Sequence, residues 1–252
     1  MTGSVLIRSL ERFGDLREDD LELSRHLVTM RSGRFGARKE IFAEGDPCGT
    51  VSVVISGWAC LSKMTDRGER QIIAFLLPGD LCDPHAYLLG YRDMTLHAIT
   101  AVDLATARAD MCEELVNRNP RICLAFRRAT AWSLAALEDR LLAVGRQSAS
   151  ARLAGLFLDI TARARRAGIG DDSGCEFPLT QQDLADACGL TSVHVNRILR
   201  EMRRNGLIQL KGRRLSLPEE RTMRGLAATP PILGNEKPGA GMSGRGNSAT
   251  LT

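Results

Sequence analysis

The chain of 252 residues is long enough for one large domain or two modest ones, and its 44% hydrophobic and 25% charged residues are ordinary for a soluble protein. No apolar run approaches the roughly 20 residues that a membrane-spanning helix needs, and the first residues, MTGSVLIRSLERFGD, are too polar and too charged for a signal peptide. We therefore expect a cytoplasmic protein that does not enter a membrane.

The cysteines exclude two classes of small domain. Seven occur, at positions 48, 60, 82, 112, 123, 175 and 188, and no two have the C-x-x-C spacing. An odd number without such a pair argues against a disulfide framework and against a zinc finger. We expect most of them to be small buried hydrophobic residues.

Evenly spaced glycines organise the front half of the chain. They stand at positions 45, 57, 68, 79 and 90, and the strand-like runs TVSVVIS, WACLSKM and QIIAFLL lie between them. Short strands with turns at this spacing predict an antiparallel sandwich or barrel. We expect a jelly-roll-like barrel over about residues 20–110, with a short helix near 17–30 before it and a further strand pair around 97–108.

A long helical stretch is predicted over residues 111–146. Pro120 interrupts it, so a new helix should begin near residue 121. From there a heptad pattern follows, formed by Thr130, Leu134, Leu137, Leu141 and Val144. A helix that joins a barrel to another domain cannot pack against both along its whole length, so we expect this seam to join two copies of the chain. The alternative is a helix buried in one chain's own core.

Residues 180–217 carry the most specific pattern. Thr180 and Asp183 form a capping-box pattern at the start of a short helix, and Gly189 ends it because glycine tolerates positive φ. Thr191 is a suitable N-cap for a second helix. The apolar residues of that helix that point inward are Val195, Ile198, Leu199 and Met202.

Two short strands follow the second helix. Asn205-Gly206 stops the helix, and apolar residues on either side of Lys211-Gly212-Arg213 predict a hairpin. Helix, tight turn, helix and hairpin together predict a winged helix-turn-helix, a module that places its second helix in the DNA major groove. An amphipathic helix at 148–166 and a polar loop at 168–176 would lead into it.

Charge favours the same interpretation. Residues 192–214 hold seven basic residues against one acid, a net charge of +6, whereas the whole chain carries +4. A solvated helix face explains most runs of this kind. DNA is favoured here because the arginines follow a turn of the right length, and because the hairpin adds a second basic cluster where it would meet adjacent phosphates.

This order of barrel, long helix and winged helix-turn-helix resembles the Crp/Fnr superfamily of bacterial transcription regulators over about residues 15–217. The most specific part is the run LADACGLTSVHVNRIL, and FLLPGDLCD is similar to the strand and turn that enter the family's cyclic-nucleotide pocket. The resemblance implies an α+β fold. We expect an N-terminal β-roll or jelly-roll sensor domain at 1–110, a dimerisation helix at 111–147, a winged helix-turn-helix at 148–218, and a disordered tail at 219–252 because that tail is rich in Gly, Pro and Ser.

The resemblance also implies which residues contact DNA. Bases would be read by Ser192, Val193, Asn196 and Arg197, and Arg197 suits guanine because a bidentate Arg–guanine pair is the commonest specific contact. Val193 departs from the family, since many relatives carry Glu there, so the operator should differ too. Phosphate contacts are expected from Thr180, Gln182, Thr191, His194, Arg200, Lys211 and Arg213.

The sensor positions also depart from the family. Relatives that bind cyclic nucleotides hold the ribose with Gly-Glu and the phosphate with Arg-Ser, and an ungapped alignment from Gly79 puts Asp83-Pro84 and Met94-Thr95 there. Methionine offers a phosphate no charge, and Arg92 could substitute only if the loop shifts. The iron–sulfur branch uses an N-terminal cysteine cluster, but the first cysteine is Cys48. We expect neither cofactor.

Two other sensors are open alternatives. Cys82 and His85 have a C-x-x-H spacing, but a structural zinc site needs four ligands and only His97 could add another nearby, so we expect no metal. Cys188 lies beside the turn of the helix-turn-helix, where oxidation would disturb the second helix. Reactivity there requires exposure and a lowered pKa.

The sequence thus predicts a homodimeric regulator that binds a pseudo-palindromic operator, with an unidentified signal acting at the barrel or through redox state. RNA polymerase is the expected protein partner. The alternative is a ligand-binding module that acts on a partner protein without DNA. An enzyme is not expected, because no paired acid–base cluster, phosphate loop or nucleophile elbow is present. The signal, the operator and the sign of regulation stay open.

Overall fold

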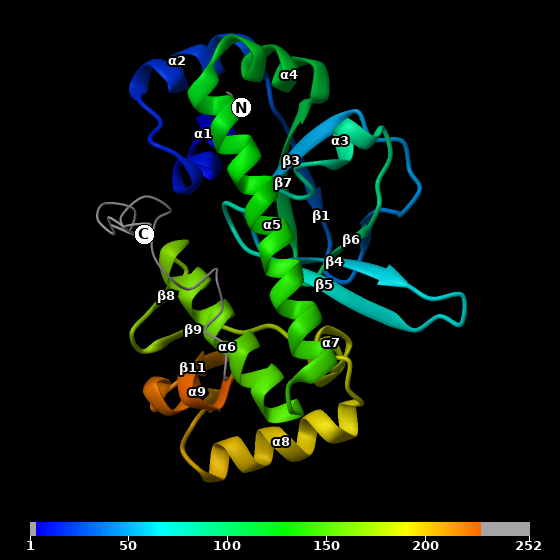
Figure 1. The fold of residues 1–252 in the computed structure, drawn as a ribbon, viewed down its shortest axis with the longest axis vertical. Coiled ribbons are helices and arrows are strands. Elements are labelled where there is room, and N and C mark those ends of the chain that lie inside the picture. The colour runs from blue at the N-terminus through cyan, green and yellow to red at the C-terminus, as the bar shows by residue number, and fades with distance from the viewer. Residues whose placement is uncertain (1–3, 228–252) are drawn as a thin grey trace, which may run out of the picture.

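The computed structural model describes residues 4–227, which form an N-terminal helical cap, a barrel, a long helix and a C-terminal domain (Figure 1). The cap consists of α1 (Ser4–Leu10), the 3-10 helix η1 (Glu11–Phe13) and α2 (Glu18–Leu27). Asp20 fixes the start of α2, because it accepts a hydrogen bond from the backbone N–H of Arg17 at 2.7 Å. The helix predicted near 17–30 is confirmed. No helix within residues 4–227 is long and apolar enough to cross a membrane.

The barrel, residues 31–108, consists of two antiparallel sheets, as predicted. Its strands are β1 (Arg31–Phe35), β2 (Glu40–Phe42), β3 (Thr50–Ser56), β4 (Ala59–Met64), β5 (Arg70–Leu76), β6 (Thr95–Ala98) and β7 (Val102–Arg108). One sheet has the order β1-β7-β3 and the other β2-β6-β4-β5. Val54 and Leu104 from the first sheet share a buried cluster with Leu61, Leu76 and Leu96 from the second.

The strand pair predicted around 97–108 is wrong in its pairing. β6 pairs with β4, whereas β7 pairs with β1 and β3 in the other sheet. The chain changes sheets at Ile99, whose backbone N–H donates to the Trp58 carbonyl at 2.7 Å. Gly57 lies under this corner at φ 81°, and a Cβ there would come within 1.9 Å of the Ala101 carbonyl oxygen. The change of sheet depends on contacts between residues that are over 40 positions apart, so the local sequence does not predict it.

The long helical stretch is broken at the predicted place. It consists of α4 (Ala109–Arg118) and α5 (Pro120–Arg146). Asn119 caps α5, because its side-chain oxygen accepts from the backbone N–H groups of Arg121 and Ile122 at 2.9 and 3.2 Å. Arg121 in turn binds Asp20 at 2.7 Å, which joins α5 to the N-terminal cap.

The C-terminal domain, residues 149–227, is built on α6. Its elements are α6 (Ala149–Arg166), β8 (Gly170–Asp171), β9 (Gly174–Glu176), α7 (Gln181–Cys188), α8 (Ser192–Arg204), β10 (Gln209–Lys211), β11 (Arg214–Ser216) and α9 (Glu220–Ala227). Two predictions are corrected here. Residues 168–176 are not a polar loop but contain the hairpin β8–β9, because Cys175 pairs with Leu215 and is buried.

The second correction concerns the start of the predicted disordered tail. Residues 220–227 form α9, since Met223 and Ala227 lie one turn apart and are both buried in the core of the C-terminal domain. The remainder of that prediction, residues 228–252, lies outside the described residues.

A buried ion-pair network joins the C-terminal domain to the barrel. Arg163 of α6 donates from Nη2 to the carboxylate of Asp80, which follows β5, and to the Phe75 carbonyl at 2.7 Å. Arg12 from the cap donates to the same carboxylate at 2.7 Å, and the Leu77 backbone N–H donates at 2.8 Å. Burial by itself raises the pKa of Asp80, but Arg163 and Arg12 outweigh it and hold the pKa at about 2.

We predict that Asp80→Asn lowers the free energy of unfolding by about 3 kcal/mol, because it leaves the buried Arg163 with too little countercharge. The folded pKa of Asp80 lies below its ordinary value of 3.8, so its contribution is complete above about pH 4 and is lost as the pH falls toward 2. Urea unfolding followed by circular dichroism at several pH values measures both effects.

Glu44→Gln is the matched control, because Glu44 pairs with Lys63 at 2.6 Å and both side chains are nearly half exposed. It should leave the unfolding midpoint unchanged. A midpoint for Asp80→Asn equal to that of the wild type between pH 4 and 7 would contradict the assigned role of this network.

Candidate nucleic-acid interface

The helix-turn-helix has the local structure that the sequence predicts. Asp183 and Thr180 form a reciprocal capping box, in which the Asp183 N–H donates to the Thr180 hydroxyl at 3.1 Å and the Thr180 N–H to the Asp183 carboxylate at 2.9 Å. Gly189 ends α7 in the left-handed conformation, at φ 62°. The Thr191 hydroxyl then accepts from the His194 N–H at 3.2 Å and starts α8.

α8 separates an apolar face from a polar one. Val195, Ile198, Leu199 and Met202 are buried in the core of the C-terminal domain. α8 lies at one end of the molecule (Figure 1), and its opposite face lines a concave surface. This surface is lined by Gln181, Ser192, Val193, Asn196, Arg197, Arg200, Arg203 and Arg204. The structure therefore brings all four predicted base-contacting residues to one surface.

Hydrogen bonds hold two of these side chains in place. The Asn196 amide donates to the Gln181 side-chain oxygen at 2.9 Å, and Arg197 Nη2 lies 2.9 Å from His194 Nε2. Val193 is 79% exposed, which is unusual for an aliphatic side chain and leaves a methyl surface at the first turn of α8. Gln181 was not predicted as part of this surface, because a contact from α7 to α8 depends on how the two helices cross.

The predicted phosphate-contacting residues are all at least partly exposed. Thr180, Gln182, Thr191, Arg200, Lys211 and Arg213 are exposed, and His194 is partly exposed. The hydroxyls of Thr180 and Thr191 act as helix caps, and Gln182 donates to Asp186 at 2.6 Å. Arg214 binds Asp171 at 2.7 Å, so the charge of the hairpin lies mainly at its turn, on Lys211 and Arg213.

The barrel contacts the helix-turn-helix through α7. Arg38 and Arg70 donate to the buried carboxylate of Asp183 at 2.9 and 3.0 Å, and Arg70 also donates to Asp186 at 2.7 Å. Burial by itself raises the pKa of Asp183, but the hydrogen bonds from Thr180 and Arg38 outweigh it, so the net pKa lies below its usual value. Sequence reasoning missed Arg38 and Arg70, because these residues lie more than 110 positions before their partners.

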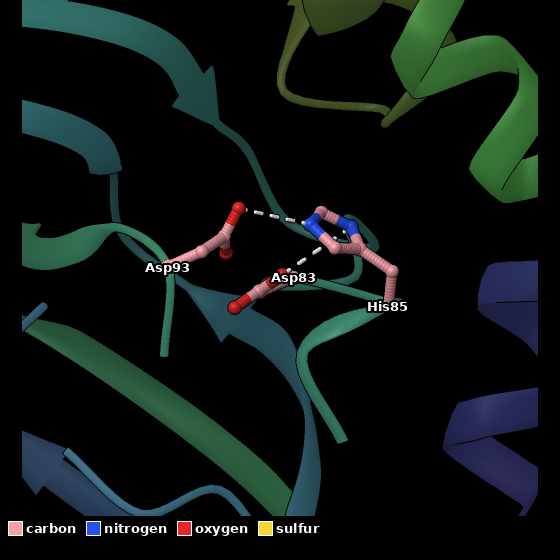
Figure 2. A group of neighbouring side chains, drawn as sticks. All are labelled: Asp83, His85 and Asp93. Carbon is pink, nitrogen blue, oxygen red and sulfur yellow. Dashed lines mark hydrogen bonds and ion pairs between the residues drawn. The ribbon is translucent and has the colours of Figure 1, made fainter. Parts of the chain in front are cut away.

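At the predicted sensor positions, the loop after β5 places the buried side chain of Asp83 beside His85 and Asp93 (Figure 2). Burial raises the pKa of Asp83 to about 6, although His85 lowers it. Arg92 is buried as well. Its guanidinium stacks 4.1 Å from the centre of the Phe42 ring and donates to the Thr50 hydroxyl at 2.7 Å.

Met94 and Thr95, the other predicted sensor pair, offer no cation. Met94 packs against the apolar cluster inside the barrel, and the Thr95 hydroxyl accepts the backbone N–H of Glu44 at 3.0 Å.

Neither Cys188 as a redox site nor Cys82 as a metal ligand is favoured by its surroundings. Cys188, the last residue of α7, is buried in the core of the C-terminal domain, and burial raises the pKa of its thiol to about 12, so it is protonated at neutral pH. Cys82 packs with the apolar residues inside the barrel rather than beside His85, and His97 lies on β6 opposite Glu40 and Cys60. The residues of the C-x-x-H motif therefore do not act together.

Both halves of the chain match known domain families. Residues 33–119 match the cyclic nucleotide-binding domain and residues 151–226 match the Crp-like helix-turn-helix domain. The transcriptional activator protein FnrL of Cereibacter sphaeroides is 29% identical over 184 residues, which cover 71% of this chain and 73% of that protein. The nitrogen fixation regulation protein FixK of Azorhizobium caulinodans is 28% identical over 189 residues, 75% of each chain.

The fold comparison agrees. The structure of FixK2 from Bradyrhizobium japonicum has a TM-score of 0.73 at 25% identity, covering 80% of this chain and 98% of that one. The predicted fold class is thereby confirmed. With both domains present in this order, and with α8 exposed at the end of the molecule, the chain belongs to the Crp/Fnr family of DNA-binding transcription regulators.

Proposed function

We propose that this chain binds a pseudo-palindromic operator as a homodimer, with α8 in the major groove and the β10–β11 turn on the flanking backbone. The observation that carries the proposal is the single concave surface on which Ser192, Val193, Asn196 and Arg197 meet. In this assignment Arg197 reads guanine and Val193 packs on a thymine methyl group. The regulator acts by binding rather than by catalysis, and it works in the cytoplasm, where bacterial DNA lies.

The dimer is proposed to form along the second half of α5. The first half is buried against the N-terminal cap through Ile122 and Phe126. Beyond it, the apolar residues of the predicted seam are turned to solvent, and Leu134 and Leu141 are 58% and 73% exposed. A row of exposed leucines at heptad spacing is stable when it packs against a second helix of the same kind.

The proposed signal is not a cyclic nucleotide bound in the family's usual way. Arg92, the cation beside the sensor loop, already binds Thr50 and stacks on Phe42. Asp83 lies 3.9 Å from Arg92 and would repel a phosphate brought to it. RNA polymerase is the proposed protein partner.

Arg197→Ala should weaken binding to the operator by about 1–3 kcal/mol and relax specificity at one base pair, because it removes a bidentate contact to a base. Lys211→Ala should weaken all sequences alike and lower the salt dependence by about one phosphate contact. Sequencing the DNA that the purified protein retains identifies the operator, and fluorescence anisotropy at several salt concentrations then measures both variants.

Arg118→Ala is the control, since it removes the same charge from α4, where Arg118 pairs with Glu114. Unchanged operator affinity of Arg197→Ala would show that the assigned helix register is wrong. If the wild-type dimer bound no DNA at moderate salt, the alternative of a module that regulates a partner protein would be favoured.

Leu141→Glu should convert the dimer to a monomer and reduce operator affinity, because two facing carboxylates replace an apolar contact at the seam. Size-exclusion chromatography with light scattering measures the mass. Met64→Glu is the matched control, since Met64 is 60% exposed at the end of β4 and is not part of the predicted seam. A dimeric Leu141→Glu protein would exclude this interface.

A further inference from the structure

Three buried carboxylate oxygens in the segment between β5 and β6 have no hydrogen-bond partner. Within residues 4–227, four buried side-chain polar atoms lack such a partner, and three of them belong to Asp83 and Asp93. The Asp83 side chain is completely buried, and neither of its carboxylate oxygens accepts a hydrogen bond. A buried carboxylate whose oxygens accept no hydrogen bond is costly. The free oxygens of this cluster are therefore available to bind a ligand.

His85 contacts both carboxylates (Figure 2). Its Nδ1 is 3.4 Å from an Asp83 oxygen, and its Nε2 is 3.2 Å from an Asp93 oxygen. One ligand atom from each of the three side chains lies within 4.8 Å of the others. Ligand atoms that share an ion at about 2.0–2.2 Å lie roughly 3–3.5 Å apart. One ion binds only one of the two imidazole nitrogens, so side-chain rotation of His85 or of a carboxylate is needed to complete the site.

The backbone directs Asp83 into this position. Its φ is 102°, a region that residues with side chains rarely adopt. The Gly79 turn and Asp80 come before it, and Pro84 follows. Strain of this kind persists where the surrounding structure imposes it, and it clusters at ligand sites.

We propose that Asp83, His85 and Asp93 bind a divalent first-row transition-metal ion. Two carboxylates and one imidazole suit Mn²⁺, Fe²⁺, Co²⁺ and Zn²⁺. The two carboxylates and Arg92 together carry a net charge of −1. His85 and Asp93 are 30% and 26% exposed, so solvent can supply the remaining ligands.

The proposed ligands flank α3 (Ala86–Leu89) in the chain, because Asp83 and His85 precede it and Asp93 follows it. An ion would therefore join the two ends of this loop. Asp83 lies three residues after Asp80, which binds Arg163 of the C-terminal domain, so the site adjoins the network that connects the two domains. Metal binding itself does not depend on DNA binding, so the test measures the ion directly.

The test uses full-length protein without a purification tag, stripped with chelator and titrated with Mn²⁺, whose free form gives an electron paramagnetic resonance signal. Mn²⁺ is chosen because it prefers oxygen and nitrogen ligands over the seven thiols. We expect one ion per chain. Loss of an outer-shell partner alone costs about 10–100-fold in affinity, so Asp83→Asn and Asp93→Asn should each weaken binding by more than about 100-fold.

His97→Gln is the matched control, because His97 lies on β6 outside the cluster, and it should bind as the wild type does. Thermal unfolding gives a second measurement. Mn²⁺ should raise the Tm of the wild type by at least about 3 °C and leave that of Asp83→Asn unchanged. Without metal, Asp83→Asn should be no less stable than the wild type, since the amide removes a buried carboxylate whose oxygens accept no hydrogen bond.

Two results would overturn the proposal. One is the absence of stoichiometric binding of Mn²⁺ and of Zn²⁺ up to about 1 mM. The other is equal affinity of the wild type, Asp83→Asn and Asp93→Asn. Should Asp83→Asn fail to fold, His85→Gln replaces it, because His85 is partly exposed and its loss removes a ligand without changing the buried carboxylate.

Discussion

The buried pair between Asp80 and Arg163 is the contact on which the arrangement of the molecule depends. Asp80 ends the turn after β5, Arg163 lies on α6, and Arg12 adds a contact from the N-terminal cap. A buried ion pair is stable only when its remaining polar atoms are also bonded, and here the Leu77 N–H and the Phe75 carbonyl complete it. One carboxylate therefore contacts the cap, the barrel and the C-terminal domain.

A second set of ion pairs connects the barrel to the helix-turn-helix. Arg38 and Arg70 bind α7 through Asp183, while the polar face of α8 remains open. The barrel therefore contacts α7, the helix that precedes α8, without covering the residues assigned to DNA. Cations gather around α8, whereas the segment between β5 and β6 holds three buried carboxylate oxygens without a hydrogen-bond partner.

The candidate DNA-contacting surface was predictable because its determinants are local. The caps at Thr180 and Thr191, the left-handed Gly189 and the spacing of α8 depend on neighbours within a few residues. Predictions failed where a distant segment decides the outcome. Residues 168–176 form strands because Leu215 lies beside Cys175, and α9 forms because α6 offers it a buried surface.

The sequence by itself determined the family, the order of the domains and the residues of the helix-turn-helix, since helix periodicity, turn chemistry and charge clustering are written in consecutive residues. Only the tertiary structure decided how the domains meet and what the barrel contains. Asp80 and Arg163 are separated by 83 positions, and Asp83 faces His85 and Asp93 only because its backbone turns the carboxylate inward. Such contacts depend on how the sheets and helices pack against one another, and the pattern of a single sequence does not predict that packing.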